Sequence, residues 1–243
     1  MPKEYFNEGI EYNRKAKPLI FVLETSEKMG GEQISALNKA MANFTRLASE
    51  LDLECWDYAV EIGVLTYDDS ARWATPHLEL LEYFQWTDCT TKGAAKLDTA
   101  LVELNNQLRR SKLLHWPAGN DVPIIIFVSN SIPNDMAWNS ALEQLHKNSW
   151  FVHATKIAIT TKPSSDCEVF STLVGDADAV ISLPSIDALE SILPTTAIAA
   201  TLFRARGNEE LSNSGALIAN NVREHFPEHY PPQENSLIWD LDW

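Results

Sequence analysis

Cysteine and basic residues are scarce in this sequence, and each shortage restricts what the protein can be. The three cysteines, Cys55, Cys89 and Cys167, are far apart and form no CxxC pair, so neither a disulfide framework nor a zinc site is indicated. We expect reduced, buried thiols in a cytoplasmic protein. Lys and Arg number 19 against 34 Asp and Glu, which gives a formal net charge of −15. This balance argues against nucleic acid or an anionic membrane as the main partner, because both require clustered cations.

The usual catalytic and targeting signatures are also missing. The chain contains no GxSxG, no GxGxxG after a strand and no GxxxxGK[ST]. Residues 1–17 have no apolar core of signal-peptide length, and no run approaches the ~20 apolar residues of a membrane span. His225 and His229 have a metal-ligand spacing, but Pro227 between them disfavours the helix that such a pair needs. We therefore predict a soluble protein that is not an enzyme, and keep an enzyme of unknown class as an unsupported alternative.

Apolar runs and amphipathic stretches alternate along the chain. Runs with strand character cover residues 19–23, 60–67, 71–73, 122–128, 151–159 and 179–183. Apolar residues at helical spacing predict helices over residues 31–51, 94–108, 136–147, 167–174 and 186–203. This alternation predicts an α/β fold with a doubly wound, mainly parallel sheet flanked by helices, and the Asp68–Ser70 turn predicts one antiparallel edge hairpin.

Composition divides the chain into three parts. Residues 1–17 are mixed and charged and predict a surface arm, and residues 18–203 carry the alternating pattern of one domain. Residues 204–243 form a polar C-terminal extension that ends in an Asp-rich segment with Trp239 and Trp243. This segment either packs on its own domain or is a docking tail, since aromatic side chains are common anchors in protein interfaces.

The loop after the first strand is the first place to look for a site. Ligands of open α/β sheets bind beyond the carboxyl ends of strands, where several loops and helix N-termini converge. Here the apolar run Leu19–Leu23 is followed by Glu24, Ser26 and Lys28, and then by a Gly-Gly pair that opens a helix. These three polar side chains are therefore the first candidates.

Four segments together resemble the von Willebrand factor A domain, most closely the stand-alone bacterial members associated with tellurite resistance and stress. Residues 24–34 resemble the DxSxS loop of that family, and residues 61–73 its second-strand hairpin. Residues 93–101 resemble its Gly-Gly-Thr-Ala-Leu helix start, and residues 127–142 its Thr-Asp-Gly loop. The resemblance covers residues 18–203 and implies a Rossmann-like doubly wound sheet. It also implies a metal-ion-dependent adhesion site, in which Mg²⁺ and a partner's carboxylate complete an octahedral shell.

Carried over residue by residue, that metal site is degenerate. The first Asp becomes Glu24, the first Ser is present as Ser26, the second Ser becomes Lys28, the loop Thr becomes Ala95 and the later Asp becomes Asn130. An ammonium in place of a ligand hydroxyl would repel a divalent ion strongly. We therefore expect no metal and no other cofactor. An atypical but working Mg²⁺ site remains the alternative.

Two details of this assignment stay open. An alternative alignment of the third segment, residues 93–101, places Thr91 at the position of the family's loop Thr. It also puts Gly93 and Lys96 at helix positions that are apolar in the family. Lys28 either replaces the metal by pairing with Glu24 or points into solvent.

The functional prediction is a non-catalytic adaptor that binds another protein without a metal. Its candidate contact residues are Lys28, Asn130, Trp86, Trp138, Trp239 and Trp243. For Trp86 and Trp138 the alternative is core packing, which is the common state of Trp in such proteins. By resemblance, the context is a bacterial signalling or stress-response complex that includes kinase and phosphatase pathway components.

Overall fold

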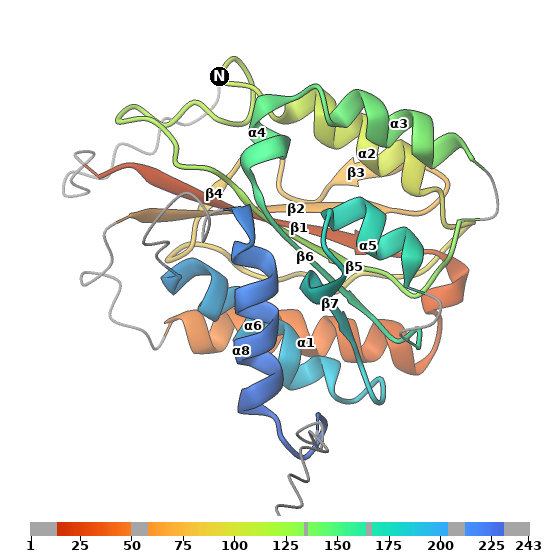
Figure 1. Ribbon diagram of the computed structural model, residues 1–243. Helices are drawn as coiled ribbons and strands as arrows, with labels where there is room; N and C mark the ends of the chain where they lie inside the picture. The colour runs from red at the N-terminus through yellow and green to blue at the C-terminus, as the bar shows by residue number, and fades with distance from the viewer. Residues whose placement is uncertain (1–13, 50–57, 134–135, 164–166, 204–211, 231–243) are drawn as a thin grey trace, which may run out of the picture.

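A computed structural model describes residues 14–49, 58–133, 136–163, 167–203 and 212–230, and these residues form a seven-stranded sheet with helices on both faces (Figure 1). The strand order is β3-β2-β1-β5-β6-β7, with β4 also paired to β2. β1 (Ala16–Glu24), β2 (Ala59–Tyr67), β5 (Ile124–Val128), β6 (Thr155–Thr160) and β7 (Val180–Ser182) run parallel. β3 (Ala71–Trp73) and β4 (Glu79–Leu80) are antiparallel to β2. The predicted fold class and edge hairpin are confirmed.

Alternating residues of β1 face two separate apolar clusters. Leu19, Phe21 and Leu23 pack on the side of α1 (Glu32–Ser49), α6 (Leu189–Leu202) and α8 (Ser214–His225). Ile20 and Val22 pack on the side of α2 (Leu97–Gln107), α3 (Ala137–Leu145) and α5 (Glu168–Val174). β1 is buried at all nine positions, as expected for a strand covered on both faces.

The structure corrects the predicted strand over residues 151–159. Its first part is helical, because α4 (Ser149–His153) precedes β6 and Asn148 caps α4 by accepting a hydrogen bond from the amide of Trp150 (3.0 Å). Phe151 is fully buried from this short helix. A short apolar run does not by itself distinguish a strand from a buried helical turn.

Helix α8 was not predicted from the sequence, although it is integral to the domain. Ile218, Ala219 and Val222 belong to the apolar cluster beneath α1 and α6. Gly215 allows α8 to approach β6, because a Cβ there would lie 2.2 Å from the carbonyl oxygen of Lys156. Residues 214–225 of the 204–243 extension therefore pack on the sheet. Within the described part of the chain, no helix combines the length and the apolar character needed to cross a bilayer.

Candidate functional site

The carboxylate of Glu24 lies at the carboxyl end of β1 and is fully buried. Among the described residues it accepts four hydrogen bonds. Its Oε1 accepts from the hydroxyls of Ser26 (2.5 Å) and Ser131, and its Oε2 accepts from the hydroxyl of Ser129 (2.7 Å) and the amide of Asn130 (2.9 Å). A carboxylate offers about four acceptor positions, so protein donors already fill all of them.

The hydroxyl oxygens around Glu24 are engaged as well. Ser26 Oγ accepts from the amide of Lys28 (3.2 Å), and Ser129 Oγ accepts from the amide of Ser131 (3.2 Å). Asn130 Oδ1 accepts from the hydroxyl of Thr161, which follows β6. The cluster therefore satisfies a buried charge entirely with hydrogen bonds, which is the condition for keeping such a charge inside a protein.

Sheet register explains why these side chains meet. Leu23 pairs with Val128 across the parallel β1–β5 ladder, so the next residues, Glu24 and Ser129, lie side by side. The structure thus brings Glu24, Ser26 and Asn130 together as predicted. It adds Ser129 and Ser131, which the sequence analysis missed. The signal that could have found them is the Ser-Asn-Ser run directly after the most apolar strand.

Lys28 does not pair with Glu24, so that hypothesis is wrong. Lys28 is exposed in a short 3₁₀ turn (Glu27–Met29), and within the described part of the chain neither an ion pair nor a hydrogen bond of its ammonium is found. The physical reason is that the four donors already saturate the Glu24 carboxylate, so an ammonium would lose its hydration without gaining a free acceptor. The solvent-pointing alternative holds.

The segment that includes Thr91 and Ala95 is tied to two neighbouring loops. The amide of Lys92 donates to the carbonyl of Thr25 (3.0 Å), and the amide of Glu27 donates to the carbonyl of Gly93 (2.9 Å). Ala95 packs against the apolar cluster of α2 and α3. The backbone beside Thr91 therefore borders the Ser26 loop, whereas Ala95 supplies only an apolar contact.

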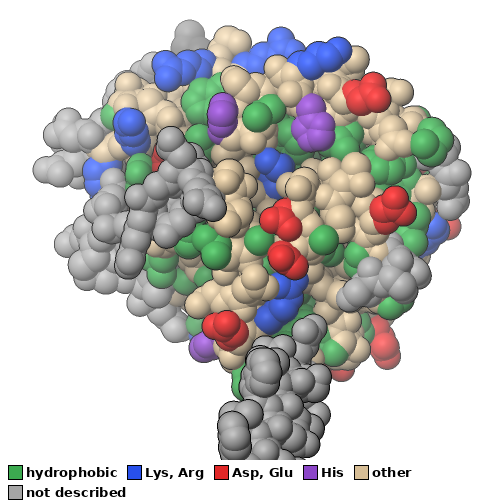
Figure 2. All heavy atoms as spheres, viewed as in Figure 1, with side chains coloured by type: hydrophobic (Ala, Val, Ile, Leu, Met, Phe, Trp, Pro, Cys, Tyr) green, Lys and Arg blue, Asp and Glu red, His purple; other side chains and the backbone are tan. Residues whose placement is uncertain are grey.

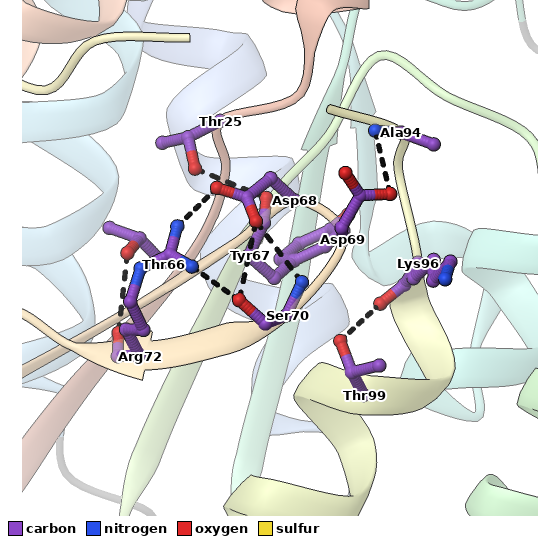
Figure 3. Close-up of polar contacts among 10 residues, drawn as sticks. All are labelled: Thr25, Thr66, Tyr67, Asp68, Asp69, Ser70, Arg72, Ala94, Lys96 and Thr99. Carbon is purple, nitrogen blue, oxygen red and sulfur yellow. Dashed lines mark hydrogen bonds and ion pairs between the residues drawn. The ribbon is translucent and has the colours of Figure 1, made fainter. Parts of the chain in front are cut away.

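A second polar cluster holds the hairpin turn between β2 and β3 (Figure 3). Asp68 is buried, forms an ion pair with Arg72 and accepts a hydrogen bond from the backbone amide of Ser70 (3.1 Å). Burial alone would raise the pKa of Asp68, but the hydrogen bonds from Arg72 and Ser70 and the charges of Arg72 and Lys92 outweigh it and lower that pKa. The amide of Lys96 donates to the Asp68 carbonyl (3.0 Å), which fixes the start of α2 against this turn.

Tyr67 connects the two clusters from the end of β2. Its carbonyl accepts from the amide (2.8 Å) and the hydroxyl (3.2 Å) of Thr25. Burial, followed by the nearby charge of Glu24, raises the pKa of the Tyr67 phenol, against a hydrogen bond with Ser129 that lowers it. The phenol therefore stays neutral beside Glu24.

As arranged, these residues do not suit a hard cation. Mg²⁺ requires six oxygen ligands in near-octahedral geometry, and the oxygens of Glu24, Ser26 and Asn130 already take part in internal hydrogen bonds. The position of the second family Ser holds Lys28, and that of the loop Thr holds Ala95 or, in the alternative alignment, Thr91. Among the described residues, no group of three or more His, Cys, Asp or Glu side chains could hold a metal ion.

The tryptophan candidates differ in exposure. Trp138 is only 8% exposed and belongs to the apolar cluster of α2 and α3, so its assignment as a contact residue is wrong and the core alternative holds. Trp86 is partly buried against the α1 cluster, and its Nε1 has no hydrogen-bond partner among the described residues.

Trp239 and Trp243 lie outside the described residues, as does Cys55. Cys167 is buried and Cys89 is half-buried, both as free thiols.

Comparison with known proteins identifies the fold. No protein-family model and no curated protein matches the chain. Among solved structures, similarity extends to a von Willebrand factor type A protein from Catenulispora acidiphila (TM-score 0.53, 10% identity, 75% of this chain and 42% of that chain). It also extends to a pilus adhesin of Lactobacillus rhamnosus GG (TM-score 0.55, 10% identity, 86% of this chain and 31% of that chain). A third similar structure is proximal thread matrix protein 1 of the mussel byssus (TM-score 0.52, 14% identity, 74% of this chain and 46% of that chain). The chain spans less than half the length of each of these structures. These similarities show that the chain has the fold of a von Willebrand factor A domain.

Proposed function

We propose that the protein is a non-catalytic adaptor that binds another protein without a metal ion, through the loops at the carboxyl edge of its sheet. The observation that carries this proposal is the saturated Glu24 carboxylate. In the von Willebrand factor A domains that the sequence resembles, the corresponding carboxylate belongs to a site that binds a partner through a metal cation. Here the same carboxylate is used to fasten the loop after β1 to the loop after β5. Recognition is therefore left to the outer surface of these loops.

The exposed surface at this edge supports a binding role. Lys28, Lys92 and Lys96 are all exposed, and their loops are joined by main-chain hydrogen bonds. A surface that is already ordered loses little conformational entropy when a partner binds. The neighbours with this fold include a pilus adhesin and a thread matrix protein, so the fold is used in proteins with adhesive and structural roles.

The non-catalytic part of the proposal rests on the chemistry of this edge. A pocket lies beside the Glu24 cluster, between the ends of β5, β6 and β7 and the start of α6. Its lining consists of apolar side chains together with Ser129, Asn130, Thr160 and Thr161, and contains no titratable group. An active site would require a nucleophile with a base, or an acid–base pair, facing such a pocket.

The cellular setting that we propose is a bacterial cytoplasmic signalling or stress-response complex with kinase or phosphatase components. Its support is the resemblance of the four sequence segments to stand-alone bacterial members of this fold. Co-expression with the products of neighbouring genes tests it. A specific partner should co-purify equally in EDTA and in MgCl₂, and a Lys28→Glu, Lys92→Glu variant should lose it. Loss in EDTA alone would favour the alternative of a working Mg²⁺ site.

Titration calorimetry gives the direct test of metal independence. We expect no saturable heat when Mg²⁺ or Mn²⁺ is titrated to millimolar concentration, because the candidate ligands already have internal partners. Asn130→Ala, which removes the one side-chain amide oxygen at the site, should give the same trace as the unaltered protein. Micromolar binding that is lost in Asn130→Ala or in Glu24→Ala would overturn the proposal.

A further inference from the structure

Exposed cations gather at the opposite end of the molecule from Glu24, where β5 and β6 begin. They come from the turn after α2 and from the connection between α3 and β6. We define the basic patch as the exposed residues Arg109, Arg110, Lys112, His115, His146, Lys147 and His153. Its positive charge comes from the Arg and Lys side chains, since burial, followed by the charge of Lys156, lowers the pKa of His146. In Figure 2, Lys, Arg and His side chains gather over α3 and α4, and most of the Asp and Glu side chains in that view lie below them. We propose that this basic patch binds an acidic segment of a partner protein.

Specific contacts hold the two halves of the patch together. Asn148 Nδ2 donates to the carbonyl of Leu108 (3.1 Å) and to Oδ1 of Asn105 (3.1 Å), which fastens the end of α3 to the end of α2. The guanidinium of Arg110 lies over the ring of Trp150, 5.9 Å from its centroid. The cations are therefore carried on a fixed frame, and a partner that binds them does not need to order the two turns.

The patch is almost free of acidic residues, which is unusual for this chain. Neither residues 104–120 nor residues 144–156 contain an Asp or a Glu, although these acids make up 34 of the 243 residues. Within the described part of the chain, no ion pair joins Arg109, Arg110, Lys112 or Lys147 to an acid, and Lys147 donates instead to the neutral Gln144 (3.1 Å). Along the chain, the acids that flank these two segments are Glu103, Asp121 and Glu143, and Asp176 lines a pocket with Lys156. The positive charge of the patch is thus left uncompensated on its own surface.

Helix capping does not account for this arrangement. Cations in the last turn of a helix stabilise it by interacting with the helix dipole, and this effect is lost beyond that turn. α2 and α3 have no basic residue in their last turns, and Arg109, Arg110, Lys112 and Lys147 all follow the helix ends. His153 is the patch residue that lies in the last turn of a helix, α4, and the carbonyls at that end are capped by the ammonium of Lys156, which lies outside the patch. The patch cations are therefore available to a ligand.

The chemistry of the patch favours an acidic protein segment over nucleic acid. Proteins that bind single-stranded nucleic acid use exposed aromatic faces for base stacking. The aromatic rings near this patch are not open faces. Phe151 is buried, and Trp150 is half-buried with the Arg110 guanidinium over it. Trp116 is also half-buried, and its Nε1 donates to the carbonyl of Arg14 (2.9 Å). A nucleic acid that extended beyond the patch would also meet a protein with a net charge of −15. A short acidic segment can be held within the patch, because salt screens charges beyond about 8 Å in physiological conditions.

Fluorescence anisotropy with a labelled peptide of ten glutamates tests this proposal. We expect saturable binding at low salt that weakens by at least about tenfold when the salt concentration is raised from 50 to 300 mM. The triple variant Arg109→Glu, Arg110→Glu, Lys112→Glu should weaken binding at least about tenfold. The pair Lys112→Glu, Lys147→Glu, which leaves the Arg110–Trp150 contact in place, should also weaken it.

The matched control reverses three cations at the other end of the molecule. Lys28→Glu, Lys92→Glu, Lys96→Glu changes the net charge by the same amount and should alter peptide affinity by less than about twofold if the patch is the site. Equal losses in both triple variants would show a response to net charge alone and would overturn the proposal. Tighter binding of a labelled thirty-nucleotide DNA strand than of the peptide would assign the patch to nucleic acid instead. The partner proposed for the Glu24 edge is tested with the Lys28→Glu, Lys92→Glu variant, so the two proposals can fail separately.

Discussion

Glu24→Gln should lower the free energy of unfolding by about 2–4 kcal/mol. The buried carboxylate accepts hydrogen bonds through both oxygens, whereas the amide that replaces it accepts through its oxygen and donates through its nitrogen. The amide nitrogen of the new side chain would face hydrogen-bond donors, among them the backbone amide of Asn130, which cannot turn away. The hydroxyls of Ser26, Ser129 and Ser131 would also lose the charge that orients them. Urea unfolding followed by tryptophan fluorescence measures this loss.

Glu27→Gln is the matched control for that experiment. Glu27 is exposed and lies three residues further along the same loop, so its neutralisation should change the free energy of unfolding by less than about 0.5 kcal/mol. If the two variants unfold at the same urea concentration, the carboxylate of Glu24 does not hold the β1 and β5 loops together in the way described above.

Glu61→Gln is expected to stabilise the fold, and increasingly so as the pH rises. Glu61 lies on β2, is 7% exposed and accepts one hydrogen bond from Asn120 (3.1 Å). Burial raises the pKa of Glu61 to about 7, against the opposing effect of that hydrogen bond. The unfolded chain then loses this proton near pH 4.5, well before the folded protein does. Stability is therefore greatest below about pH 4.5, falls as the pH rises to about 7 and changes little from this group above that.

Glutamine retains the acceptor for Asn120 but does not titrate. The gain from Glu61→Gln should grow from about 1 kcal/mol at pH 5.5 to about 3 kcal/mol at pH 8, the order of magnitude expected for this difference in pKa. Urea unfolding at both pH values measures it, with the exposed Glu82→Gln as a control whose effect should be small at each pH. A gain that is the same at pH 5.5 and pH 8 would show that Glu61 is already ionised in the folded protein.

The sheet could be predicted from the sequence because its strands are unusually apolar. Runs such as Leu19–Leu23 and Ile124–Val128 are covered on both faces, so their composition reveals both their state and their central position. The failures have two physical causes. The apolar run that contains α4 is too short to distinguish a helical turn from a strand. α8 is placed by contacts with distant parts of the chain, such as the close approach of Gly215 to β6. Local sequence patterns do not contain that information.

At the candidate site, the sequence identified the place but not the contacts. Glu24, Ser26 and Asn130 follow strand ends, and parallel strands bring their carboxyl ends to one edge. The partners of Glu24 depend on the exact register between β1 and β5, which the sequence did not specify. Lys28 was a plausible partner by charge. Three hydroxyls and one amide nevertheless satisfy Glu24 from closer range, which left the ammonium in water.

The backbone ties among the loops at the carboxyl edge have a consequence for how this surface can change. Gly93 has a φ of +64°, and a Cβ there would lie 2.0 Å from Oδ2 of Asp69, so this position requires glycine. The connections through Thr25, Glu27, Lys92 and Lys96 use main-chain atoms and do not depend on the exposed side chains. Residues 28, 92 and 96 can therefore be varied widely without loss of loop shape. The same scaffold could acquire new specificities by surface mutation alone, which makes it a suitable starting point for selected binding libraries.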